Sequence, residues 1–181
     1  MPTWKSRGLR GSAFEEMLNR TNELYREKGL ALVQKIPTPI TPIEIDQKSR
    51  HITLAYFDQK STVDYIGACQ GIPICFDAKE SATETFSLQN IHDHQMQFMT
   101  EFKAQGGVAF FLIYFTKLEL IYFMPVEEMA VFTGRAKEGG RKSFRREELR
   151  EDHYLSKHPG IMVPYLDMLD KYLSQEGVGV K

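Results

Sequence analysis

Residues 64–80, DYIGACQGIPICFDAKE, decide the fold prediction for this 181-residue chain, because they contain two strand-like runs separated by a turn. The runs, 63–66 and 72–78, consist mainly of apolar residues, and Gly67 and Gly71 lie between them. Short apolar runs bounded by glycine are typical of paired strands. The pattern therefore predicts a β-hairpin.

The same hairpin carries three charged residues that are predicted to meet. Asp64 lies in the first run, and Asp77 and Lys79 lie two residues apart at the end of the second. Side chains two apart on a strand share one face, and a hairpin can bring Asp64 beside them. A surface ion pair is the simpler interpretation of an Asp-x-Lys pattern. Burial is favoured because Asp77 directly follows the apolar run 72–76.

Two carboxylates and a lysine in one place suit phosphodiester hydrolysis. That reaction needs a hard cation to orient and polarise the attacking water, and positive charge to stabilise the transition state. Paired carboxylates bind Mg²⁺, and a lysine supplies the positive charge. Asp64, Asp77 and Lys79 are thus the candidate catalytic residues.

The flanking segments predict further helices and strands. A capping-box pattern over 12–15 starts a helix that ends at Gly29, and a strand-like alternation follows over 30–36. Prolines then favour an extended path into a polar hairpin tip over 46–51, between strands 43–45 and 52–57.

A second helix is predicted over 87–105, with apolar residues on one face. Gln95 occupies a position on that face where a hydrophobic residue is expected, so its amide needs a partner. A metal site or phosphate is one interpretation, and a bond to backbone or buried water is the other. The side chains of His92, Asp93 and His94 are expected to diverge on this helix, so they cannot chelate one ion.

Strands over 108–115 and 118–124, a short helix from Pro125, a basic loop and a final amphipathic segment over 164–173 complete the prediction. The layout is α/β with a mixed central sheet, and the length suits one domain spanning residues 1–181.

Composition narrows the functional classes. The net charge is −1, so affinity for nucleic acid depends on local clusters. Six cations lie between residues 135 and 146, opposed there only by Glu138: Arg135, Lys137, Arg141, Lys142, Arg145 and Arg146. A solvated face balanced by the acids of 147–152 is an equally good interpretation. No apolar run approaches a membrane span, and two cysteines favour a reducing cytoplasm.

Several motifs, in order, resemble the RecU Holliday junction resolvases within the PD-(D/E)xK nuclease superfamily. They extend over almost the whole chain: 13–22 (AFEEMLNRTN), 35–39 (KIPTP), 55–57 (AYF), 61–67 (STVDYIG), 77–80 (DAKE), 86–95 (FSLQNIHDHQ) and 140–143 (GRKS). Each motif is weak alone, but the ordered set is specific. The resemblance implies a restriction-endonuclease-like core of helices around a mixed sheet, with a projecting stalk hairpin at about 43–62.

The resemblance also implies a site. Mg²⁺, with Mn²⁺ as a substitute, is expected at Thr62, Asp64, Asp77 and Gln95, with Glu15 as a further candidate ligand. Lys79 is expected to stabilise the transition state. The family usually has Glu at the position of Asp77, so the shorter acid is expected to move the metal or to change the rate and ion preference.

The implied function is symmetric nicking of four-way and other branched DNA by a homodimer, in recombination and repair. A recombinase is a further candidate partner, and no membrane is expected. Two alternatives remain open, a junction-binding scaffold that does not cleave and a nuclease of the same fold that acts on other DNA.

Overall fold

A five-stranded mixed sheet forms the centre of the molecule. The computed structural model describes residues 12–57 and 62–175. The strands, in spatial order, are β1 (Ala31–Lys35), β4 (Tyr65–Cys69), β5 (Ile72–Ser81), β7 (Val108–Phe115) and β8 (Leu120–Pro125). β5 and β7 are parallel, and the other neighbouring pairs are antiparallel. The predicted mixed sheet and the hairpin of β4 and β5 are confirmed.

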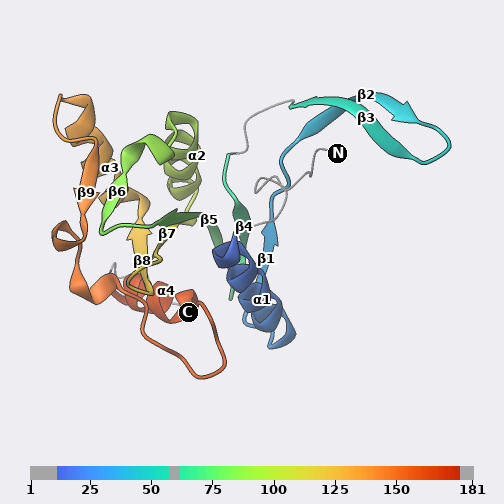
Figure 1. Cartoon of the computed structure of the whole chain (residues 1–181). Coiled ribbons are helices and arrows are strands. Elements are labelled where there is room, and N and C mark those ends of the chain that lie inside the picture. Colours follow the sequence, from blue (N-terminus) through green and yellow to red (C-terminus); the bar gives the residue numbers. More distant parts are fainter. Residues whose placement is uncertain (1–11, 58–61, 176–181) are drawn as a thin grey trace.

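Helices cover both faces of this sheet (Figure 1). They are α1 (Ala13–Glu27), α2 (Asp93–Ala104), α3 (Val126–Lys137) and α4 (Tyr165–Gln175). Apolar residues of α1 and α4 share one buried cluster, and those of α2 and α3 share the other. None of the helices in the described ranges is long and apolar enough to cross a membrane.

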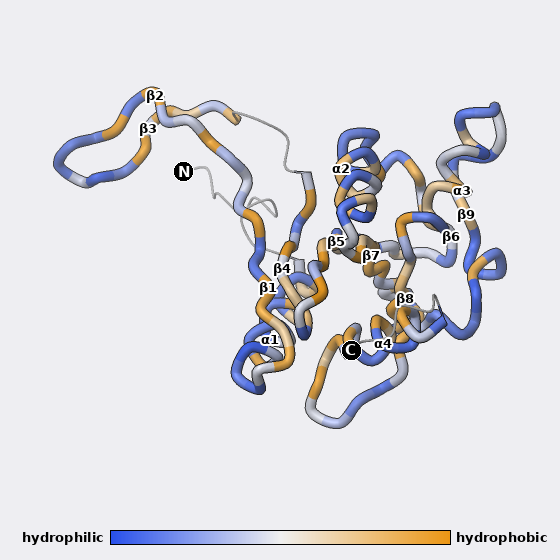
Figure 2. The backbone as a smooth tube through the Cα atoms, turned by 180° about the vertical axis from the view of Figure 1, so that it is seen from behind, coloured by the Kyte–Doolittle hydropathy of each residue, from blue (hydrophilic) through white to orange (hydrophobic). Residues whose placement is uncertain are grey.

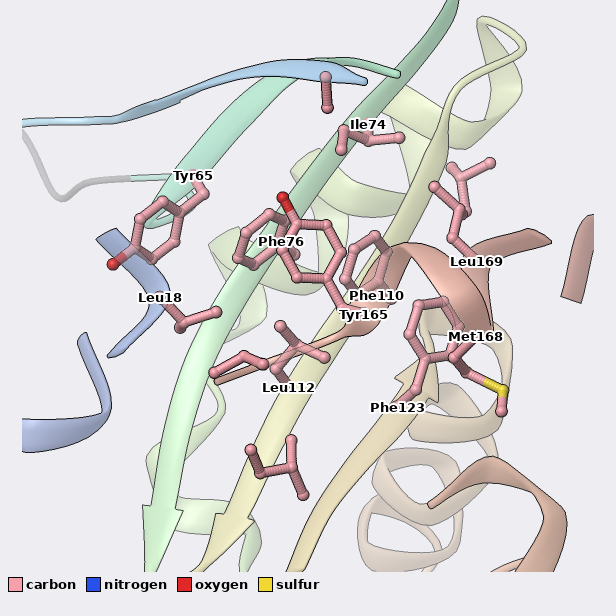
Figure 3. Packing of buried hydrophobic residues seen from close by; sticks show 14 of the residues in the cluster. Leu18, Tyr65, Ile74, Phe76, Phe110, Leu112, Phe123, Tyr165, Met168 and Leu169 are labelled. Carbon is pink, nitrogen blue, oxygen red and sulfur yellow. The ribbon is translucent and has the colours of Figure 1, made fainter. Parts of the chain in front are cut away.

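A row of stacked aromatic rings crosses the sheet on the side of α1 and α4 (Figure 3). Centroids are 4.7 Å apart between Tyr65 and Phe76, 5.0 Å between Phe76 and Phe110, and 4.4 Å between Phe110 and Phe123. Such cross-strand pairs stabilise a sheet and fix its register. Because neighbouring side chains on a strand point to opposite faces, Phe76 in this row directs Asp77 toward α2.

A two-stranded hairpin, β2 (Ile40–Asp46) and β3 (His51–Phe57), projects from the sheet (Figure 1). The polar tip predicted over 46–51 is confirmed. β2 begins earlier than predicted and includes Pro42, because the pairing shifts register next to that residue. A proline is tolerated at such an irregularity, where no ladder bond from its nitrogen is needed. The predicted stalk includes residues 58–61, which lie outside the described ranges.

The helix predicted from residue 87 begins only at Asp93, and that prediction is wrong at its start. Residues Thr85–Ser87 form strand β6, which pairs with β9 (Ser143–Arg145), and 3-10 helix Leu88–Asn90 follows. Two more 3-10 helices cover Arg146–Glu148 and Glu151–His153. Phe86 and Phe144 are buried and stacked, so long-range pairing overrides the local helical spacing.

Candidate active site

A tight turn sets the relative position of the two candidate acids. Gln70 and Gly71 join β4 to β5 with φ angles of 48° and 87°. Positive φ at both central residues is typical of a type I′ turn, whose twist matches paired strands. The resulting register places Tyr65 opposite Phe76, so the preceding Asp64 lies across from Asp77.

Each aspartate binds the backbone of the opposite strand. The Asp64 N–H donates to Asp77 Oδ1 at 2.7 Å, and the Ala78 N–H donates to Asp64 Oδ2 at 3.0 Å. Two reciprocal bonds hold the carboxylates together at the end of the hairpin. The predicted meeting of Asp64 and Asp77 is confirmed.

Asp77 contacts every other member of the candidate site cluster, which consists of Asp64, Asp77, Lys79 and Gln95. Its Oδ2 lies 2.8 Å from Lys79 Nζ and accepts a 2.6 Å hydrogen bond from Gln95 Nε2. The Asp77 side chain is fully buried, whereas 17% of the Lys79 side chain is exposed. A surface ion pair is therefore excluded. Lys79 extends from a buried carboxylate toward solvent.

Gln95 is buried, as its place on the apolar face of α2 indicated. Its partner is a carboxylate, and its Oε1 also accepts a 3.3 Å bond from the His92 N–H. Both ends of the amide are thus used. In this arrangement Gln95 orients Asp77, and ligation of a metal by its oxygen requires the amide to turn.

Burial and the neighbouring Asp77 raise the pKa of Asp64 from an ordinary 3.8 to about 6. Two acids face one lysine here, so the cluster carries excess negative charge when both are ionised. A divalent cation would relieve that repulsion. The structure therefore fits the expected metal on charge as well as on ligand type.

Asp64→Asn is expected to raise the melting temperature of the metal-free protein above pH 6. Since the folded-state pKa is raised, ionised Asp64 destabilises the fold at high pH, and this cost disappears as pH falls through about 6 toward 3.8. Near pH 8 the substitution should raise the free energy of unfolding by about 1–3 kcal/mol and the melting temperature by several degrees. Near pH 4 both increases should be close to zero. Thermal melts in chelator across this range measure it. Destabilisation at pH 8 would contradict the prediction.

A cleft of about 440 Å³ opens beside the cluster. Its walls come from α1, β5 and the segment before α2: Ser12, Glu15, Ala78, Lys79, Glu80, Gln89, Asn90 and His92. Glu15 reaches this cleft, where its Oε2 lies 2.6 Å from Lys35 Nζ, and its N–H donates to Ser12 Oγ, the expected helix cap. The second candidate role of Glu15, beside a metal, is compatible with this position.

Thr62 is half-buried two residues before Asp64. Within residues 12–57 and 62–175, no hydrogen bond joins its side chain to the acids. Its expected part in a metal site therefore stays a prediction. The structure brings together Asp64, Asp77, Lys79 and Gln95.

Several residues of the cleft were not predicted as site residues, among them His92 and Glu80. His92 precedes α2 as its N-cap, and its ring stacks on that of His94 with centroids 5.4 Å apart. The prediction that the side chains of His92, Asp93 and His94 diverge is wrong for the two histidines, because His92 lies outside the helix, whereas Asp93 turns to Lys137. Glu80 accepts a 3.2 Å bond from the N–H of Phe14 at the start of α1. The apolar spacing of Leu88 and Ile91, which suggested a longer helix, concealed the cap.

The mixed sheet has helices on both faces, and the acid pair and lysine lie where β4 begins and β5 ends, which is the restriction-endonuclease-like layout expected from the sequence. The chain belongs to the RecU family, Recombination protein U, whose model matches residues 9–171.

Relatives named Holliday junction resolvase RecU match most of the chain. The Lactococcus lactis protein is 42% identical over 91% of this chain and 78% of its own length. The Geobacillus protein is 37% identical over 91% of this chain and 84% of its own length. The Bacillus subtilis protein is 34% identical over 99% of this chain and 87% of its own length. A solved structure of Hjc, a Holliday junction resolvase from Archaeoglobus fulgidus, aligns with a TM-score of 0.38 and 12% identity, covering 65% of this chain and 78% of its own.

Proposed function

We propose that this chain is a Holliday junction resolvase, a metal-dependent endonuclease that nicks opposing strands of four-way DNA junctions. Membership of the RecU family supports the substrate. The observation that carries the chemistry is the buried Asp77, which binds Lys79, Gln95 and the backbone of Asp64 at once. A junction-binding scaffold without cleavage has no need of an acid pair and lysine held in this way beside a cleft.

The residues that would hold the metal are Asp64 and Asp77, with Thr62 and Gln95 as neutral oxygen donors. Glu15, across the cleft, is a further candidate. No group of three or more histidine, cysteine or acidic side chains that could hold a metal occurs in the described residues. Two carboxylates with neutral oxygen donors suit Mg²⁺, which binds few carboxylates and retains several waters, with Mn²⁺ as a substitute. When bound, the ion polarises the scissile phosphate and lowers the pKa of water.

The side chains of the chain itself position charge around the scissile phosphate. Asp77 holds Lys79 Nζ at one place beside the cleft, where a fixed cation stabilises negative charge that develops on phosphate oxygens. Gln95 fixes the Asp77 carboxylate from the other side. Because these groups are held before substrate arrives, little reorganisation is needed during the reaction.

The projecting hairpin β2–β3 is proposed to enter the centre of the junction. Deleting its tip, residues 46–51, should reduce the preference for four-way junctions over linear duplex by about tenfold or more, with residual nicking retained. Nicking is retained because the tip lies at the far end of the hairpin from β4, β5 and α2, the elements around the candidate site (Figure 1). Competition cleavage with labelled junction and duplex measures the preference. An unchanged preference would favour a nuclease that acts on other DNA.

A homodimer is proposed from the exposed apolar face of the hairpin. Ile45 and Ile52 are cross-strand partners, and Ile52, Leu54 and Tyr56 alternate along one face of β3. Each of these side chains is about half exposed. Hydrophobic segments, coloured orange, recur along the hairpin in Figure 2. A lone two-stranded ribbon is marginally stable in water, and exposed apolar patches of this kind mark interfaces. A second copy would cover the face.

Leu54→Asp with Ile52→Asp is expected to convert the dimer to monomer. Charges on an apolar interface cost several kcal/mol when buried, so the shift should exceed 100-fold in dissociation constant. Light scattering after gel filtration gives the mass, and Lys48→Asp at the tip is the control. A dimer that persists in the double variant would place the interface elsewhere.

We also propose a cytoplasmic location, where the free thiols of Cys69 and Cys75 stay reduced.

A further inference from the structure

The six cations between residues 135 and 146 are not equally neutralised. Arg135 and Arg141 both pair with Glu148, Arg146 approaches Glu151, and Lys137 pairs with Asp93. Among residues 12–57 and 62–175, no acidic side chain pairs with Lys142 or Arg145, and both are exposed. Lys142 and Arg145 are therefore the cations of this segment without an ion pair in the described ranges, and Arg145 shares a pocket with Glu84 and Glu147.

The backbone that carries them is held firmly. α3 ends in a Schellman motif, in which the Gly139 N–H donates to Ala136 O at 3.2 Å and the Gly140 N–H to Arg135 O at 2.9 Å. Gly139 has a φ of 88°, and a Cβ at Gly140 would lie 2.7 Å from Arg135 O. Only glycines fit this turn.

Glu148 also holds the 135–146 segment in place. Its carboxylate accepts bonds from Arg135 Nη1 at 2.5 Å, Arg141 Nη1 at 3.2 Å and the Arg145 N–H at 2.9 Å. The Arg135 bond, followed by the others, lowers the pKa of Glu148. The acid therefore stays ionised and ties both ends of the 135–146 segment together, so Lys142 and Arg145 extend from a fixed base.

Two contacts place this segment beside the active-site cleft. The Leu88 N–H donates to Lys142 O at 3.1 Å, and Leu88 directly precedes Gln89, which lines the cleft. Lys137 Nζ lies 2.8 Å from Asp93 Oδ1, next to His92 on the cleft wall. Both side chains of the Lys137–Asp93 pair are largely exposed, so the lysine can readily exchange its partner. The segment is largely hydrophilic (Figure 2).

We propose that Lys137, Lys142 and Arg145 form a ridge that binds backbone phosphates of one duplex arm of the DNA next to the scissile phosphate. This rests on the proposed function and names the surface that the arm contacts. Exposed cations on a fixed backbone, without an exposed aromatic, suit phosphate contacts rather than base stacking, and the aromatic residue of this segment, Phe144, is buried. The ridge is a positioning surface.

The test compares Lys142→Gln/Arg145→Gln with the matched control Lys28→Gln/Lys157→Gln, which removes two exposed lysines away from the cleft. Binding to a labelled four-way junction and to a linear duplex of one arm is measured without metal over a range of salt. In the ridge variant the magnitude of the slope of log K against log[salt] should decrease by about two on both DNAs. Binding at 0.1 M salt should be on the order of tenfold weaker. The control should leave both unchanged.

Cleavage at subsaturating junction should fall in the ridge variant in proportion to its weaker binding, and the Lys28→Gln/Lys157→Gln control should cleave at the unaltered rate. An unchanged salt slope, or loss on the junction alone without loss on the duplex, overturns the arm-binding ridge. Such a result leaves the proposed function intact, because the unaltered protein still binds and cuts. If the unaltered protein fails to bind the junction, the proposed function itself fails.

Discussion

Lys79→Ala is expected to lower the rate of junction cleavage by about 10²–10³-fold while junction binding stays within a few-fold of the unaltered protein. Removing one preorganised charge that acts on the transition state typically costs this much. Lys79 has the required position, because Asp77 holds its Nζ at 2.8 Å and part of its side chain reaches the cleft. Single-turnover nicking of saturating junction measures the chemical step.

Lys103→Ala is the matched control for that variant. Lys103 also forms an ion pair, with Glu127, but it lies in the last turn of α2, at the opposite end from His92 and the cleft. Its loss should leave the nicking rate unchanged. If Lys79→Ala retained full activity, or lost binding and cleavage in equal measure, the role assigned to Lys79 would be wrong.

Asp77→Asn is expected to have the larger effect, a loss of about 10³-fold or more in cleavage. The change removes one of two negative charges proposed for the metal and leaves Lys79 without its acid. It also places an amide where Oδ2 now accepts from both Lys79 and Gln95. Junction binding should persist, because the ridge and hairpin are untouched.

A second readout separates loss of metal from loss of fold in Asp77→Asn. Mg²⁺ should raise the melting temperature of the unaltered protein, since a ligand that binds only the folded state stabilises it, but not that of the variant. Asp170→Asn, at an exposed position on α4, is the control and should respond to Mg²⁺ normally. An equal metal response in Asp77→Asn would exclude Asp77 as a ligand.

Much of the sheet could be predicted because its pattern is local. The runs on either side of Gly71 and the glycine itself lie within one short stretch, so the hairpin follows from neighbouring residues, whereas Gly67, predicted between the strands, lies within β4 and pairs with Ile74. The start of α2 could not be predicted in the same way. Residues 87–92 follow helical spacing, but β6 pairs with β9, more than fifty residues away, and that contact determines their structure.

The residues of the site also differ in whether local sequence or tertiary packing determines their positions. Asp64, Asp77 and Lys79 could be predicted because two-residue spacing and a hairpin bring them together. Gln95 was identifiable as a buried amide, but its partner was open, since the distance between α2 and β5 depends on tertiary packing. His92 was missed because its place in the cleft depends on the true start of the helix.

Cleavage of a labelled mobile four-way junction, with and without Mg²⁺, tests the central claim most directly. The account predicts paired nicks at symmetric positions in opposing strands when the unaltered protein and Mg²⁺ are both present, and none when the metal is withheld or Asp77 is replaced by Asn. Tight junction binding with no nicking in either Mg²⁺ or Mn²⁺ would contradict it and establish a scaffold instead.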